Sequence, residues 1–146
     1  MLDKVNRIDY DKLEVLETLG EGTFGTVLKA VYIGEVVAIK TIKIINITEH
    51  VLNKFKEEIV FMAPLHHANL VRLIGACLDN GPKKLGVVLE FAENGSIQSL
   101  LHDVEGETTW GEHHAWLAVG TVRCLKYLHW DLGEPVIHRD IKGHTP

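Results

Sequence analysis

Gly20-Glu21-Gly22-Thr23-Phe24-Gly25-Thr26-Val27 is the stretch that decides how the chain folds. Its glycines follow the spacing G-x-G-x-x-G, which lets backbone amides approach phosphate oxygens without obstruction by side chains. The spacing alone is a weak signal, because it also occurs in dinucleotide-binding loops and in ordinary hairpins. A dinucleotide-binding loop opens a helix. Here the residues from Thr26 to Tyr32 alternate and are rich in β-branched side chains. We therefore predict that the loop joins two antiparallel strands and covers a nucleotide.

The strand expected after this hairpin carries a charge among apolar residues. Val36, Ala38, Lys40 and Ile42 fall on one face, because side chains alternate between the two faces of a strand. The helix that follows carries a carboxylate in its apolar stripe.

That stripe consists of Val51, Phe55 and Met62, which align at about 100° per residue, and Glu58 falls inside it. A carboxylate in such a stripe is costly to bury without a partner. Lys40 is the obvious partner, so we predict an ion pair between Lys40 and Glu58. The alternative is two separate surface charges with solvated tips.

The order of the remaining patterns predicts an α+β protein, with a sheet and one helix followed by a helical portion. Residues Met1 to Lys12 form a polar lead-in, Asn46 is the expected helix cap, and Pro64 ends that helix. The expected strands are Leu13–Leu19, Thr26–Ile33, Val36–Ile42, Leu70–Leu78 and Leu85–Phe91, and the expected helices are Thr48–Ala63, Ser96–His102 and Glu112–His129.

Composition narrows the classes of protein. The chain has 146 residues, 46% of them hydrophobic and 24% charged, with a net charge of -5, so a basic nucleic-acid-binding face is not expected. No apolar run approaches the ~20 residues that span a bilayer, and the start of the chain lacks the apolar core of a secretion signal. Cys77 and Cys124 are far apart and fit no metal spacing. We expect a cytoplasmic protein with no metal site built from cysteine or histidine.

Val136-Ile137-His138-Arg139-Asp140-Ile141-Lys142 is the most specific motif in the chain. It resembles the H-R-D-L-x-x-x-N catalytic loop of protein kinases, just as Val37-Ala38-Ile39-Lys40 resembles their V-A-I-K strand. Together with the glycine loop, these motifs resemble protein kinases. The phrases His67-Ala68-Asn69-Leu70-Val71 and Leu73-Ile74-Gly75-Ala76-Cys77 further resemble the tyrosine-kinase-like group of serine/threonine kinases. The resemblance covers nearly everything from Ile8 to Lys142.

The resemblance implies a protein-kinase-like fold over residues 8–146. A five-stranded antiparallel small lobe with one helix would occupy residues 13–92, and the first helices of an incomplete helical large lobe would occupy residues 93–146. It also implies an ATP-dependent kinase acting on protein serine or threonine hydroxyls, with Mg²⁺ and a protein substrate that the sequence does not identify.

The resemblance further assigns roles to individual residues. Lys40 and Glu58 would set the phosphates, Asp140 would accept the hydroxyl proton, and Lys142 would contact the γ-phosphate. Leu89 would be the gatekeeper, and backbone groups of Glu90 and Ala92 would bond the adenine. The residues expected to bind the nucleotide are Leu19, Gly20, Glu21, Gly22, Thr23, Phe24, Gly25, Val27, Ala38, Lys40, Leu89, Glu90 and Ala92.

The last residues depart from the kinase pattern. Thr145 stands where the family has the Asn that binds Mg²⁺, and the chain ends at Pro146 without a D-F-G motif. We therefore expect the chain as given to be inactive in phosphoryl transfer. The alternative function is a catalytically dead module that binds a nucleotide or a protein partner. A dinucleotide-binding domain is disfavoured by the strand that follows Gly25.

Overall fold

The computed structural model divides the chain into two compact units. The first comprises Met1–His66, Val71–Ala92 and Pro146, and the second comprises His67–Leu70 and Glu93–Thr145. The first unit contains a sheet and one helix, and the second contains a long helix. The structure describes residues 2, 5–22, 25–42, 48–78, 85–97, 99, 112–139 and 141.

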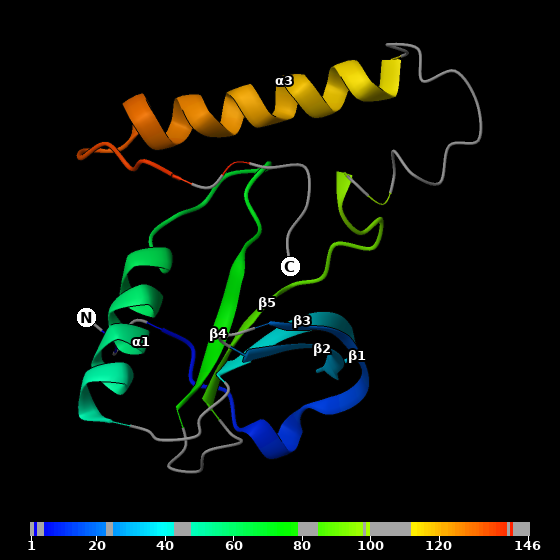
Figure 1. The fold of residues 1–146 in the computed structure, drawn as a ribbon, viewed down its shortest axis with the longest axis vertical. Coiled ribbons are helices and arrows are strands. Elements are labelled where there is room, and N and C mark those ends of the chain that lie inside the picture. Colours follow the sequence, from blue (N-terminus) through cyan, green and yellow to red (C-terminus); the bar gives the residue numbers. More distant parts are fainter. Residues whose placement is uncertain are drawn as a thin grey trace. The chain divides into compact units, whose positions relative to one another are not determined.

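A five-stranded antiparallel sheet forms the first unit together with its helix (Figure 1). The strand order is β1-β2-β3-β5-β4, which confirms the predicted α+β class. β4 begins at Leu73 rather than at the predicted Leu70, because the preceding residues form a turn in which the Leu70 N–H donates to the His67 carbonyl at 3.0 Å. The strands are β1 (Glu14–Gly22), β2 (Gly25–Tyr32), β3 (Glu35–Ile42), β4 (Leu73–Leu78) and β5 (Leu85–Glu90).

Helix α1 spans Glu49–Met62 and is capped by Thr48, whose hydroxyl accepts from the Val51 N–H at 3.3 Å. The predicted cap, Asn46, was therefore wrong, and that residue lies outside the described part of the chain. The buried side of α1 is also rotated from the predicted stripe. Phe55 and Ile59 are buried, whereas Val51 is exposed. Helix α1 therefore packs against the sheet through a face centred on Phe55 and Ile59.

Two apolar cores lie on opposite faces of the sheet. Alternation along β5 separates them, because Val87 belongs to one core and Val88 to the other. The core on the α1 face contains Val5, Phe55, Ile59, Ala76, Leu85 and Val87. The opposite core contains Ile8, Leu13, Ala30, Val37, Ile39, Cys77 and Val88.

The N-terminal segment belongs to both cores, so its description as a polar lead-in was wrong. Val5 and Ile8 keep only 7% and 3% of their surfaces exposed. A short 3-10 helix, η2 (Tyr10–Lys12), follows and leads into β1. The Asp9 carboxylate caps it by accepting from the Asp11 N–H at 3.0 Å.

The second unit is built around helix α3 (Glu112–Lys126), which continues into one wider π-helical stretch, η3 (Tyr127–Asp131). The Lys126 ammonium bonds the Asp131 carboxylate at 2.6 Å across this stretch. The His67 and Tyr127 rings stack with centroids 5.1 Å apart, which joins the two segments of the unit. Most of the predicted Ser96–His102 helix lies outside the described residues. No helix in the described part of the chain is both long enough and apolar enough to cross a membrane.

Candidate functional site

The register of the sheet gathers the predicted nucleotide-binding residues on one face. Gly20 pairs with Val27, Val27 with Lys40, and Lys40 with Val87. Side chains of directly paired residues point to the same side of an antiparallel sheet. Since Val87 belongs to the core under α1, Lys40 and Val27 face the α1 side as well.

A second cross-strand row lies beside the first on the same face. Ala38 pairs with Leu89 across β3 and β5, and Lys29 pairs with Ala38 across β2 and β3. Leu89 is half-buried and packs against the core under α1. The small Ala38 side chain thus lies beside Leu89, and the two rows form a largely apolar floor that also carries Lys40 and Lys29.

The glycines of the loop differ in what the fold requires of them. A Cβ at Gly25 would lie 1.8 Å from the Thr41 carbonyl oxygen, so the β2–β3 pairing itself demands glycine there. A Cβ at Gly20 would meet nothing within 4 Å, and one at Gly22 only the Gly25 carbonyl at 3.8 Å. The folded chain leaves space at both positions, which fits a phosphate approaching their amides. Thr23 and Phe24 lie outside the described residues.

The predicted ion pair is present. The Lys40 ammonium lies 3.4 Å from the Glu58 carboxylate. The expectation of a buried pair was wrong, because the two side chains keep 52% and 49% of their surfaces exposed. The rotation of α1 explains this, since Ile59 rather than Glu58 occupies the middle of its buried side. A pair this exposed contributes only ~0–1 kcal/mol to stability.

Lys29 is a neighbour of the site that the sequence analysis missed. Its ammonium lies 3.1 Å from the Glu17 carboxylate and 5.0 Å from the centroid of the Phe91 ring. These contacts link β1 and β2 to the segment that follows β5. The signal was in the sequence, because Lys29 lies two residues after Val27 and therefore on the same face. Like Lys40 on the neighbouring strand, Lys29 is a charged residue on a largely apolar face of the sheet.

The predicted adenine-binding segment follows β5. The Glu90 N–H donates to the Arg72 carbonyl at 3.0 Å, which anchors the end of the strand, and the Arg72 guanidinium lies 4.0 Å from the Glu90 carboxylate. Ala92 is exposed and is the last residue of this part of the first unit. Backbone groups of Glu90 and Ala92 are the ones that the resemblance assigns to the adenine. Their role remains a prediction.

The catalytic-loop motif lies in the second unit, where the structure describes Val136–Arg139 and Ile141. The Val136 N–H donates to the Leu128 carbonyl at 2.8 Å, which holds the approach to the motif against η3. Arg139 has a φ of 65°, in the left-handed region that non-glycine residues rarely adopt. Such strain is concentrated at functional sites. Asp140 and Lys142 lie outside the described residues, so their predicted roles stay predictions.

Potential metal ligands are not clustered in the described part of the chain. Among them, no three His, Cys, Asp or Glu side chains gather in a way that could hold a metal ion. Three described residues fit the phosphates of a nucleotide. Gly20 and Gly22 have open space beside them, and Lys40 supplies an ammonium.

Known proteins match this chain along nearly its whole length. Residues 13–144 match the family described as the protein kinase domain. The chain is 37% identical over 137 residues to wall-associated receptor kinase-like 10 of Arabidopsis thaliana, which covers 91% of this chain and 17% of that protein. It is 36% identical over 137 residues to a probable serine/threonine-protein kinase of Dictyostelium discoideum, covering 93% of this chain and 14% of that protein. Calcium/calmodulin-regulated receptor-like kinase 1 of Arabidopsis thaliana is 36% identical over 126 residues, which cover 86% of this chain and 28% of that protein.

The chain therefore spans only 14% to 28% of the length of these three relatives. The matched part begins with β1 and includes the glycine loop, Lys40, Glu58 and the His138-Arg139 motif. On the strength of this match, the chain belongs to the protein kinase family.

Proposed function

We propose that this chain forms the nucleotide-binding part and the beginning of the catalytic loop of an ATP-dependent protein serine/threonine kinase. The observation that carries the proposal is the Lys40–Glu58 ion pair at 3.4 Å, on the same sheet face as Val27 and Ala38. An ammonium held by a carboxylate beside an apolar floor suits a ligand with an apolar base and anionic phosphates. The family generally uses ATP and Mg²⁺.

Each side chain of the site would have a separate task. The amides of Gly20 and Gly22 would approach the phosphates, and Lys40, oriented by Glu58, would supply positive charge to them. Val27, Ala38 and Leu89 would pack against the base. Backbone groups of Glu90 and Ala92 would hydrogen-bond its edge.

The second unit would supply the acceptor of the hydroxyl proton. Asp140 would take this role and Lys142 would support the transferred phosphate, by their place in the motif. A lysine at the position of Lys142 favours serine or threonine over tyrosine as the acceptor. The protein substrate would be a separate molecule, which the sequence does not identify.

A catalytically dead binding module is the second candidate. Thr145, at the position of the family's magnesium-binding Asn, favours it, because a hydroxyl is a weaker magnesium ligand than an amide carbonyl. A phosphotransfer assay separates the two candidates. Transfer of labelled phosphate to a protein acceptor supports the kinase, and binding of ATP without transfer supports the module.

Calorimetry with ATP and with adenosine tests the site itself. We expect weak binding of both ligands, tighter for ATP, with little dependence on magnesium. Lys40→Met should bring the affinity for ATP down to that for adenosine, while adenosine binding stays unchanged, because only phosphates need the ammonium. The exposed Lys12, on η2 outside the site, provides the matched control Lys12→Met. Equal binding of ATP and adenosine to the unmodified chain would contradict the proposal.

A further inference from the structure

The N-terminal segment of residues 5–8 extends the sheet by pairing with the outer edge of β4. Arg7 and Ala76 form a parallel bridge. The Ile8 N–H donates to the Ala76 carbonyl at 3.0 Å, and the Ala76 N–H donates to the Asn6 carbonyl at 2.9 Å. The Asn6 side-chain amide adds a longer bond to the Ile74 carbonyl at 3.4 Å. Residues 5–8, called the strap below, thus cover an edge that would otherwise expose its backbone groups.

The strap sends one large apolar side chain to each face of the sheet. Val5 joins Phe55 and Ile59 in the core under α1, and Leu2 packs against the same core. Ile8 joins the opposite core, whose buried members include no residue of α1. Both residues are buried, but only the core of Val5 contains residues of α1.

β4 is shaped to receive the strap. A Cβ at Gly75 would lie 2.5 Å from the Asn6 carbonyl oxygen and 2.7 Å from the Ile8 Cδ1 atom. Contacts this short do not occur, so any other residue at position 75 would push the strap away from the sheet. Glycine at this strand position is explained by the close approach of the strap.

The core under α1 connects the strap with the candidate site. A helix lying on a sheet is held by the apolar side chains between them, and Phe55 and Ile59 are the buried residues of α1. Val5 contributes to the same core from the side of the strap. The helix turn that carries these residues also carries Glu58, which holds Lys40 at 3.4 Å. Figure 1 shows the start of the chain, in blue, beside α1.

We propose that the strap positions α1, and that Val5 is a positioning residue for the Lys40–Glu58 ion pair. Docking of the strap would keep Glu58 beside Lys40, and release of the strap would let the helix move and weaken the hold on the phosphates. This inference rests on the proposed function for its effect on ATP, but its effect on α1 is independent of any ligand.

Hydrogen exchange of the full chain without nucleotide tests the first step. Val5→Ala should speed exchange of the α1 amides, whereas Ile8→Ala, a larger deletion in the opposite core, should change them less. If the two variants change α1 equally, or if neither does, the strap does not position the helix. Should Val5→Ala fail to fold, Val5→Thr keeps the shape of the side chain and gives the same comparison.

Calorimetry tests the second step. Val5→Ala should weaken ATP binding about tenfold, the lower end of the effect of losing one hydrogen bond to a charged group, with adenosine binding unchanged. In the Lys40→Met background, Val5→Ala should have no further effect on ATP, although it should still speed α1 exchange. An undiminished effect of Val5→Ala in that background would overturn the positioning role. If the wild-type chain binds ATP and adenosine equally, the proposed function fails. The exchange experiment still shows whether the strap positions α1.

Discussion

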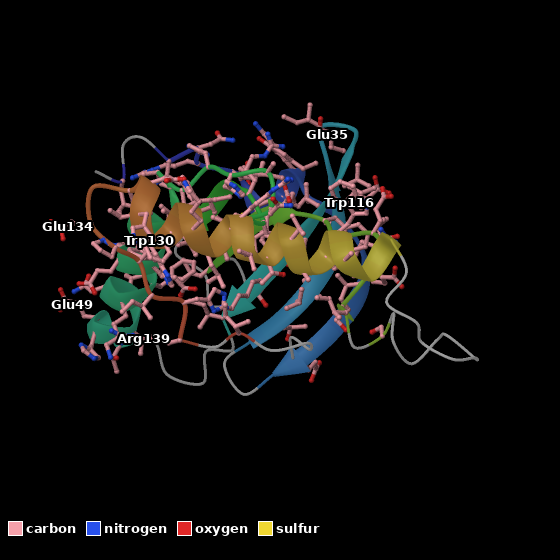
Figure 2. The ribbon with its side chains drawn as sticks, turned by 90° about the horizontal axis from the view of Figure 1, so that it is seen from above. Glu35, Glu49, Trp116, Trp130, Glu134 and Arg139 are labelled. Carbon is pink, nitrogen blue, oxygen red and sulfur yellow. The ribbon has the colours of Figure 1, made fainter. Side chains whose placement is uncertain are left out.

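The two units of the chain differ in how they bury apolar residues. In the first unit the sheet has a core on each face, and Ile39, Ile59 and Val88 have no exposed surface. In the described part of the second unit only Leu128 is a buried apolar residue. Trp116 and Trp130, near opposite ends of the long helical segment in Figure 2, are 65% and 74% exposed. The comparison shows that helical periodicity alone does not provide a core.

The described part of the second unit contains several polar and ring contacts. Among them are the Lys126–Asp131 ion pair, the His67–Tyr127 stack and the Val136–Leu128 hydrogen bond. An exposed ion pair contributes ~0–1 kcal/mol, whereas one fully buried Leu or Ile contributes ~1.5–3 kcal/mol. The first unit should therefore be the more stable of the two.

Hydrogen exchange should show the largest difference between the units. We expect the amides of β3 to be protected about 1000-fold more strongly than those of α3, because opening free energies range from near zero for weakly packed segments to the global value. The measurement is exchange on the monomeric chain. Equal protection of the α3 and β3 amides would show that the second unit is as stable as the first, despite its exposed apolar side chains.

Alanine substitutions of one buried and one exposed β-branched residue should give the next largest difference between the units. Ile59→Ala should destabilise the chain by ~2–5 kcal/mol, because Ile59 is fully buried and its loss leaves a cavity. Val122→Ala should change stability by less than ~0.5 kcal/mol, since Val122 is 65% exposed. Urea denaturation followed by far-ultraviolet circular dichroism measures both. A large effect of Val122→Ala would mean that this helix face is covered in solution.

Matched glycine substitutions probe the backbone of each unit. Gly25→Ala should cost ~2–3 kcal/mol, because the new Cβ would meet a strand carbonyl that cannot move without breaking the β2–β3 pairing. At Gly120 the nearest atom is the Asn69 side-chain nitrogen at 3.0 Å, which can rotate away. Gly120→Ala should therefore lie within ~1 kcal/mol of wild type, with the better helix propensity of alanine offsetting the contact. Thermal unfolding of the two variants decides between these outcomes.

The two cysteines should show the smallest difference. Cys77 is fully buried in the first unit, and Cys124 is half-buried on α3. Burial raises the pKa of the Cys124 thiol, so at pH 8 less of it is thiolate than in an exposed cysteine. Iodoacetamide should modify Cys124 more slowly than a model thiol, faster as the pH rises, and always before Cys77. Faster modification of Cys77 would reverse the order of stability of the units.

Several features of this protein were determined by its sequence. The glycine spacing followed by β-branched alternation predicted a hairpin, and the charges at Lys40 and Glu58 predicted each other as partners. These predictions succeeded because alternation, helical periodicity and the need to pair charges act over a few neighbouring residues. The His138-Arg139 motif was equally readable, since its chemistry depends on residue types at fixed spacing.

Only the tertiary structure decided which surfaces are covered. The sequence analysis placed residues 5–8 in a polar lead-in, yet they extend the sheet, because Gly75 on distant β4 leaves room for them. The periodicity of α1 could not distinguish the side with Phe55 and Ile59 from the stripe that contains Glu58. The contact of Lys29 with Phe91 likewise joins strands far apart in the chain. Burial and exposure depend on what non-local segments pack against a residue, and a local pattern does not contain that information.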